Sequence, residues 1–258
     1  MDGEDSYTEI WPSDAQEPNY AAHLISLSAV IFLIVSKVIV YFTPKSVPSQ
    51  SLWRWKNITV SLCHALLISG WAVFCFYQSP KLAEDLISTY TVSSHSLVSV
   101  SFGYFVYDVV DMLLYQRTRQ SFELLGHHTV IFCAFSIAVF TRLYVGYAVV
   151  SLLVELNSIF LHIRQLLQIL GYSKNNCLYR LNSLINLGTF VVFRISVLSW
   201  MTRWIVINRH LIPLAFYSVG SIGLAIITVM NIVLLYRLFR SDFISKKEKI
   251  TDNSKSSI

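Results

Sequence analysis

The sequence predicts an all-α protein that crosses a membrane several times. Of its 258 residues, 54% are hydrophobic and 14% are charged, whereas soluble domains carry about 25% charged residues. The apolar residues fall in long blocks, several of which reach the roughly 20 residues that a spanning helix needs. The basic residues form short clusters rather than a continuous face, so nucleic acid is not an expected partner.

Seven apolar segments follow an acidic tail at residues 1–20. The first segment, 21–42, is expected to form the first transmembrane helix. Beyond the tail, prolines occur only in loops or at segment ends, which favours unbroken helices. The connections are short, so helices that are neighbours in sequence should pack as antiparallel neighbours. The six further helices are expected at about 56–77, 96–115, 121–141, 145–169, 179–201 and 212–236.

The distribution of Lys and Arg predicts the orientation, because cytoplasmic loops carry an excess of these residues. One side of the predicted topology receives fourteen of the 20 Lys and Arg residues, and the other side receives four. With seven helices, this bias places the acidic N-terminus outside (or in a lumen) and the basic tail 241–258 in the cytosol. If the first segment does not span, only the N-terminus changes side. The glycosylation sequon Asn57-Ile58-Thr59 falls on the cytosolic side and is not expected to be used.

Polar and ionisable side chains lie within the apolar segments, where they are costly and face a cavity or a partner. At a rise of 1.5 Å per residue, most of them lie roughly 7–20 Å from the cytosolic face. We therefore expect an internal polar cavity in the cytosolic half, open or nearly open to the cytosol. Its candidate residues are His64, Asp108, Asp111, His127, His128, Glu155, Asn157, Ser158 and Arg194.

Spacing predicts how these residues face one another. Asp108 and Asp111 are three residues apart and share a helix face. The adjacent His127 and His128 point about 100° apart, so at most one of them points straight into a narrow cavity. Arg194 lies at mid-depth in its segment and needs an acidic partner, for which Glu155 is the candidate.

Three uses of this polar layer are open. A neutral histidine could act as a general base toward a hydroxyl or an amine. The layer also contains the residue types that bind metals, but neither an HxxxH nor an ExxH pattern supports such a site, so no metal and no cofactor are expected. The cysteines show no CxxC pair, which argues against a cysteine zinc site and against disulfides. The third use is structural, as a network that holds the helices together.

Several blocks of the chain resemble a known family. They are Leu52-Trp-Arg-Trp-Lys-Asn57, Gly103-Tyr-Phe-Val-Tyr-Asp108, Glu123-x-x-Gly-His-His128, Tyr144-Val-Gly-Tyr147 and Leu153-Val-Glu-Leu-Asn-Ser158. On these blocks the chain resembles the TLC domain family and, within it, the subgroup of TLC domain-containing proteins 1 and 2. The resemblance implies a TLC-type six-helix core over residues 47–240, with one additional N-terminal transmembrane helix.

The best-known enzymes of this family are the ceramide synthases, which acylate sphingoid bases from acyl-CoA. Their motif has paired histidines followed, one helix later, by two aspartates. His127 and His128 match the pair, whereas Glu155 replaces the first aspartate and Ser158 the second, with Asn157 beside it. Because serine supplies no carboxylate to orient a histidine, this departure weighs against an acyltransferase.

The subgroup implies a different role: regulation of phospholipid composition and fluidity at the plasma membrane, by limiting the incorporation of polyunsaturated acyl chains. Membrane lipids are then the expected partners, with acyl-CoA or a lipid-modifying enzyme as further candidates. Two alternatives remain, a lipid acyltransferase that uses the paired histidines and a non-catalytic modulator of a channel or lipid enzyme. The endoplasmic reticulum is the alternative location.

Overall fold

The computed structural model of the chain describes residues 19–116 and 119–244, and in these two ranges it contains helices and no strand. Nearly all of the predicted acidic tail, and residues 245–258 of the predicted basic tail, lie outside the described residues. Seven spans within the described ranges are long and apolar enough to cross a membrane. The prediction of an all-α, multi-pass membrane protein is confirmed.

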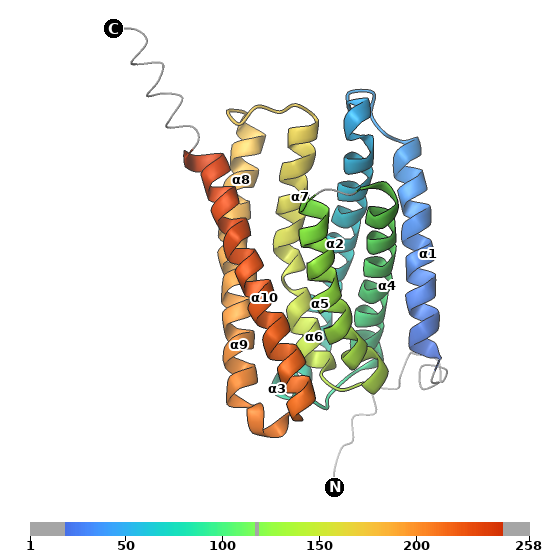
Figure 1. The fold of residues 1–258 in the computed structure, drawn as a ribbon, viewed down its shortest axis with the longest axis vertical. Coiled ribbons are helices and arrows are strands. Elements are labelled where there is room, and N and C mark those ends of the chain that lie inside the picture. The colour runs from blue at the N-terminus through green and yellow to red at the C-terminus, as the bar shows by residue number, and fades with distance from the viewer. Residues whose placement is uncertain (1–18, 117–118, 245–258) are drawn as a thin grey trace.

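The first four spans are single helices, and the fifth is a pair of helices. They are α1 (Tyr20–Tyr41), α2 (Leu52–Gln78), α4 (Val92–Tyr115), α5 (Arg119–Thr141), and α6 (Val145–Leu152) followed by α7 (Glu155–Ile169). The sixth span joins α8 (Cys177–Phe190) to α9 (Val197–Ile207), and the seventh is α10 (Leu214–Phe239). A short helix, α3 (Lys81–Glu84), lies between α2 and α4. Successive spans run in opposite directions, so α1 begins at one end of the bundle and α10 finishes at the other (Figure 1). We call the latter the C-terminal end.

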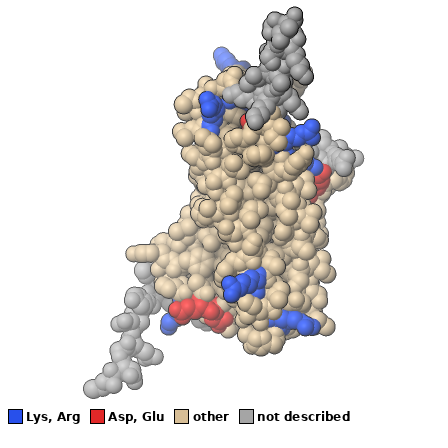
Figure 2. Space-filling view, turned by 90° about the vertical axis from the view of Figure 1, so that its left-hand side faces the viewer, with Lys and Arg blue, Asp and Glu red and all other residues tan. Residues whose placement is uncertain are grey.

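The outer surface suits a membrane. On the face drawn in Figure 2, Lys, Arg, Asp and Glu gather toward the two ends of the molecule, and a wide band of other residues lies between them. Large apolar side chains are exposed along the outer helices, such as Ile34 on α1 at 57% and Ile222 on α10 at 62%. Lipid tails would cover such a band, because the hydrocarbon core of a bilayer is about 30 Å thick.

Helix α4 is the most buried span, with 61% of its apolar window inside the bundle. It starts at a capping box, in which Thr91 Oγ1 accepts from the Ser94 amide at 3.0 Å. Small residues let α1 approach it closely: a Cβ at Gly103 would come within 2.3 Å of the Ile25 carbonyl oxygen. Ser28 Oγ donates to the Val100 carbonyl at 2.6 Å. Such small-residue packing joins helices in membranes, so α1 is an integral part of the bundle.

The prediction of unbroken helices is wrong at two places. Between α6 and α7, the amides of Leu153 and Val154 bond to carbonyls three residues back, at 3.1 and 3.3 Å, and the α-helix is interrupted. Between α8 and α9, residues Val191–Ser196 form a π-helical turn. Neither break contains Gly or Pro, so the sequence carries no local signal for it. Irregular backbone at membrane depth is tolerated where protein buries it or where it lines a cavity.

The last described residues are tied to the bundle. Helix α10 continues into a π-helical turn, Arg240–Ile244, which includes the first four residues of the predicted tail. Arg164 Nε and Nη2 each donate to the Asp242 carboxylate at 2.6 Å. Tyr179 Oη and Ser183 Oγ donate to the same carboxylate at 3.0 and 3.2 Å. This Asp242 clasp (Arg164, Tyr179, Ser183 and Asp242) holds the end of α10 against α7 and α8.

Candidate functional site

The first polar cluster joins α2, α4 and α5 around Asp108. Asn57 Nδ2 donates to Asp108 Oδ1 at 2.6 Å, and His128 Nε2 lies 3.3 Å from Asp108 Oδ2. His128 Nδ1 lies 2.8 Å from the carbonyl oxygen of Leu124, one turn back on α5. Both ring nitrogens of His128 therefore face oxygen acceptors, and neither is free to take a proton from a substrate. We call Asn57, Asp108 and His128 the Asp108 cluster.

Asp111 and His64 extend this structural region. Asp111 pairs with Lys56, one turn closer to the C-terminal end than the Asp108 cluster. His64 is 1% exposed, lies 3.1 Å from Ser101 Oγ, and stacks on Tyr104 with ring centroids 3.7 Å apart. These contacts use the imidazole for packing and for a hydrogen bond inside the bundle. The Asn57 amide is likewise occupied, in keeping with the prediction that the sequon is not used.

A second polar cluster surrounds Arg194, in the π-helical turn between α8 and α9. Its Nε donates to Asn157 Oδ1 at 2.7 Å, Nη1 to Asn231 Oδ1 at 2.7 Å, and Nη2 to Ser158 Oγ at 2.8 Å. We call these four residues the Arg194 cluster. The expected ion pair with Glu155 is wrong: no salt bridge joins the two side chains, although each feels the charge of the other. Amide and hydroxyl oxygens from α7 and α10 occupy the guanidinium instead.

Asn157 links the Arg194 cluster to α8. This fully buried amide donates to Asn186 Oδ1 at 2.9 Å and to Thr189 Oγ1 at 3.0 Å. Asn231, on α10, was not among the predicted site residues. Its signal was a single amide inside an otherwise apolar span, which in a membrane calls for a hydrogen-bonding partner.

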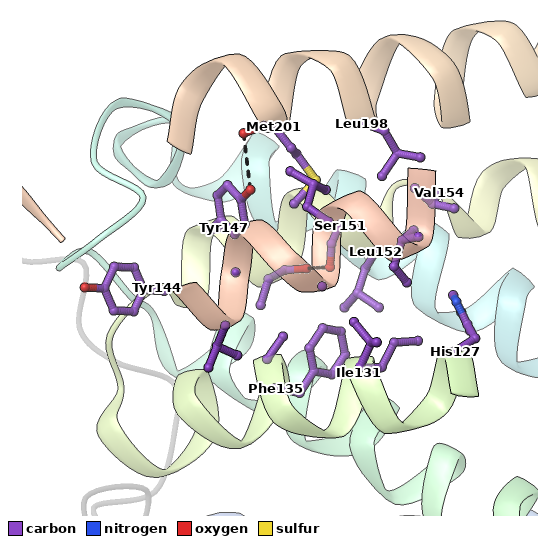
Figure 3. Close-up of a pocket in the computed structure, with 18 of the residues that line it drawn as sticks. His127, Ile131, Phe135, Tyr144, Tyr147, Ser151, Leu152, Val154, Leu198 and Met201 are labelled. Atoms are coloured by element: carbon purple, nitrogen blue, oxygen red, sulfur yellow. Dashed lines mark hydrogen bonds between the residues drawn. The ribbon is translucent and has the colours of Figure 1, made fainter. Parts of the chain in front are cut away.

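A cavity of about 140 Å³ lies between α5, α6, α9 and α10 (Figure 3). Two predicted site residues, His127 and Glu155, line it, and the remaining predicted site residues do not. The expectation of a polar cavity is thus wrong for the space that holds these two residues, because most of its wall is apolar. The apolar wall includes Phe105, Ile131, Phe135, Leu152, Leu198, Met201 and Leu224.

His127 and Tyr144 lie at opposite ends of this cavity, and Tyr147 and Met201 lie toward the Tyr144 end (Figure 3). Apart from an edge-to-face ring contact with His128 at 5.8 Å, His127 makes no polar contact with another described residue. Glu155 is the first residue of α7, directly after the break, where the partial positive charge of a helix N-terminus favours a carboxylate. One end of an apolar cavity therefore carries an imidazole and a carboxylate.

The adjacent histidines thus have different environments, as their 100° separation predicted. His128 belongs to the Asp108 cluster, and His127 lines the cavity. The lining residues of α9 and α10 were not predicted, because apolar residues in a spanning segment give no signal that separates a cavity wall from a lipid-facing surface.

The sequence profile of the TLC domain matches residues 54–240. The chain belongs to the TLC domain family. Its TLC domain therefore includes both polar clusters and the cavity, while α1 precedes the matched region. The break between α6 and α7 lies within the TLC domain, as does the π-helical turn that carries Arg194.

Three relatives illustrate the match. TLC domain-containing protein 2 of Danio rerio is 56% identical over 201 residues, which cover 78% of this chain and 81% of that protein. TLC domain-containing protein 2 of Homo sapiens is 37% identical over 205 residues, covering 80% and 77%. TLC domain-containing protein 1 of Homo sapiens is 35% identical over 191 residues, covering 74% and 76%. The resemblance to this subgroup is confirmed.

Proposed function

We propose that this TLC domain protein binds an acyl chain of a membrane lipid in the cavity between α5, α6, α9 and α10. Through this binding it regulates the phospholipid composition and fluidity of the plasma membrane and limits the incorporation of polyunsaturated acyl chains. The observation that carries the proposal is an apolar cavity within membrane-spanning helices whose one end holds His127 and Glu155.

The dimensions of the cavity favour an acyl chain. Its wall runs from His127 to Phe135 on α5, roughly 12 Å along the helix, and from Tyr144 to Glu155 along α6 and the break, roughly 16 Å. Half of a 30 Å hydrocarbon core is about 15 Å, the depth that the chains of one leaflet fill. The cavity volume of about 140 Å³ resembles the roughly 150 Å³ of an engineered apolar cavity that binds benzene, so the cavity would enclose only a segment of a chain. We propose that a straight segment fits along this wall better than one bent by several cis double bonds.

The polar end of the cavity suits the polar group at the head of such a chain. His127 is free to exchange a hydrogen bond, and the Glu155 carboxylate accepts hydrogen bonds from a hydroxyl or an amide. Arg194 and Ser158 lie close enough to act on Glu155 electrostatically. A lipid that brings its own donor would offset part of the cost of a carboxylate at membrane depth.

A lipid acyltransferase is the second candidate, because His127 and Glu155 line the same cavity. In that reaction His127 would take the proton of an acceptor hydroxyl or amine while the acceptor atom bonds to the thioester carbonyl carbon of acyl-CoA. The carbon–sulfur bond would then break, and the departing thiolate would receive the proton. The environment of Ser158 weighs against this candidate, because its hydroxyl accepts from Arg194 and the position supplies no second carboxylate.

Genetic rescue tests the proposal. Cells that lack the protein would receive the wild type, His127→Ala, Glu155→Ala, or the control His210→Ala, which alters an exposed histidine at the opposite end of the bundle. We expect the wild type and the control to restore the normal phospholipid acyl profile and membrane fluidity. The two cavity variants should fail to do so at equal expression. Full restoration by both cavity variants would overturn the proposal and favour a non-catalytic modulator of a channel or lipid enzyme.

The acyltransferase candidate has a separate test. Purified protein would be incubated with labelled acyl-CoA and lipid acceptors, and the acylated product would be measured. If the protein is an acyltransferase, His127→Ala should lower product formation by about 10²- to 10⁴-fold. Absence of product from the wild type, together with successful rescue in cells, would eliminate the enzyme and leave the binding role.

We also propose that the C-terminal end of the bundle faces the cytosol at the plasma membrane. The support is the excess of Lys and Arg on that side of the predicted topology. In intact cells, an epitope at the N-terminus should bind antibody without permeabilisation, and one at the C-terminus only after it. The reverse pattern, or staining confined to internal membranes, would contradict this placement.

A further inference from the structure

We infer that Tyr147 sets the length of the acyl chain that the cavity accepts, an inference that rests on the proposed function. The polar end of the cavity is marked by His127, and Tyr147 lies toward the other end (Figure 3). A chain whose head lies beside His127 would extend toward Tyr147 and meet its ring. Tyr147 is therefore a constriction ahead of the Tyr144 end, and its removal would lengthen the accepted chain.

The ring of Tyr147 is fixed in place. Its hydroxyl donates to the Met201 carbonyl of α9 at 3.2 Å, and its ring packs on Trp204 with centroids 5.2 Å apart. A buried tyrosine hydroxyl usually finds a hydrogen-bond partner, and here the partner lies on the opposite wall of the cavity. The Tyr147 side chain thus connects α6 to α9 and is held in one position, unlike the flexible aliphatic side chains around it.

Space continues beyond Tyr147. Tyr144, one turn earlier in the chain, also lines the cavity, and its ring packs edge-on to Phe216 of α10 with centroids 5.9 Å apart. The Tyr144 amide donates to the Ile87 carbonyl at 2.7 Å, which fixes this outer end independently of Tyr147. Removing the Tyr147 ring would open the part of the cavity between Tyr147 and Tyr144 to the chain, about one helical turn or roughly 5 Å. That distance corresponds to roughly two to four chain carbons.

A larger side chain in place of Ser151 should have the opposite effect on the accepted chain length. Ser151 lies one turn from Tyr147 on the His127 side of the same wall, and its hydroxyl donates to the Ala148 carbonyl of its own helix at 2.6 Å. Its small side chain leaves the middle of the cavity open. A leucine at this position would project into the cavity ahead of Tyr147 and shorten the accepted chain. Two substitutions in one wall are therefore expected to shift chain length in opposite directions.

The test uses the purified full-length protein in detergent and a series of saturated fatty alcohols from eight to twenty carbons, whose hydroxyl can donate to Glu155. Stabilisation against thermal unfolding is measured for each chain length. We expect Tyr147→Ala to move the most stabilising length upward by roughly two to four carbons, and Ser151→Leu to move it downward. Tyr147→Phe keeps the ring and should retain the wild-type optimum. The control is Tyr77→Ala, which removes a tyrosine that is 83% exposed on α2 and should change nothing.

The outcomes separate the inference from the proposed function. If fatty alcohols stabilise the wild type and the optimum stays unchanged in both Tyr147→Ala and Ser151→Leu, the inference is overturned and the binding role stands. If no chain length stabilises the wild type, the proposed function is overturned and the inference with it. Should Tyr147→Ala not fold, Ser151→Leu and Tyr147→Phe still decide, because a downward shift in the first and none in the second are required.

Discussion

His127 and His128 are neighbours in sequence, and they belong to two regions built on opposite principles. His128 lies in the Asp108 cluster, where both carboxylate oxygens and both ring nitrogens face a partner: Asn57 and His128 meet Asp108, and the second ring nitrogen meets a carbonyl. His127 lies at the edge of an apolar cavity and makes no polar contact with a described residue besides its ring contact with His128. The first region is closed, and the second is open.

This difference separates stability from ligand binding within a single helical turn. A satisfied buried network gains little from a ligand, and it loses much when one member is removed. An imidazole at a cavity edge contributes little to folding and is free to meet a ligand. Paired histidines are therefore a poor guide to two equivalent roles, because the face of the helix decides the role of each.

The largest effect should follow loss of Asp108. Asp108→Ala leaves His128 and Asn57 without their acceptor at membrane depth, and each buried group left unsatisfied costs about 1–3 kcal/mol, which for two groups is about 2–6 kcal/mol. The free energy of unfolding in detergent, measured with denaturant, should fall by an amount in this range. Asp108→Asn keeps an oxygen for Asn57 and should cost less.

If Asp108→Ala had the same free energy of unfolding as the wild type, the closed Asp108 cluster and the open cavity would not differ in their contribution to stability. In that case the Asp108 cluster would carry no stability, and the contrast between the two regions would fail. The control variant is informative as well. An Asp108→Asn protein less stable than Asp108→Ala would contradict the role of Asp108 as an acceptor.

A smaller effect should distinguish the two histidines directly. His128→Ala leaves Asp108 with one partner fewer and should lower the free energy of unfolding by about 1–3 kcal/mol. His127→Ala removes no hydrogen bond within the described protein and should stay within about 0.5 kcal/mol of the wild type. The same two proteins, assayed for stabilisation by fatty alcohols, should show the reverse order, with binding lost in His127→Ala. Equal stability losses would contradict the division between the regions.

The smallest effect should come from a carboxylate outside the membrane. Hydrogen bonds from the Ser88 hydroxyl and amide, at 2.5 and 3.0 Å, lower the pKa of Asp85 in the loop between α2 and α4. Its contribution to stability is present above the unfolded pKa of about 3.9 and is lost as the pH falls through the lower folded value. Asp85→Asn should therefore lower the thermal unfolding temperature slightly at neutral pH, have less effect in acid, and so flatten the acid limb.

Comparison with the Asp108 variants sharpens this prediction. Solvent screens the interactions of an exposed carboxylate, whereas those of Asp108 are screened little. If the acid limb of the thermal unfolding temperature were unchanged in Asp85→Asn, the hydrogen bonds of Asp85 in this loop would contribute no stability. A loss at neutral pH as large as that of Asp108→Ala would contradict the view that burial sets the scale of these effects.

The spans could be predicted from the sequence because long apolar blocks are separated by short connections. Helix α4 was expected to end at residue 115 and does so at Tyr115. The break after Leu152 could not be predicted, since no Gly or Pro marks it. Depth correctly placed Arg194 among polar neighbours, but depth alone could not choose Asn157, Ser158 and Asn231 over Glu155.

The site was predicted in part for the same reason. Ionisable residues at membrane depth are conspicuous in a sequence, so His127 and Glu155 were singled out. Tyr147 and Met201 were not, because aromatic and aliphatic residues are common in every spanning helix. Only the arrangement in space shows that the Tyr147 hydroxyl meets the Met201 backbone carbonyl across a cavity.

The Asp242 clasp sets an order of events during synthesis. Asp242 follows the last span, so it leaves the ribosome after α7 and α8 are complete. Until then Arg164 and Tyr179 have no carboxylate to bind, and the ends of α7, α8 and α10 are not joined. The ends of α7, α8 and α10 are thus joined only after Asp242, just beyond α10, has been synthesised. A fusion partner joined directly after Arg240 would displace this clasp, whereas one joined after Ile244 would leave it in place.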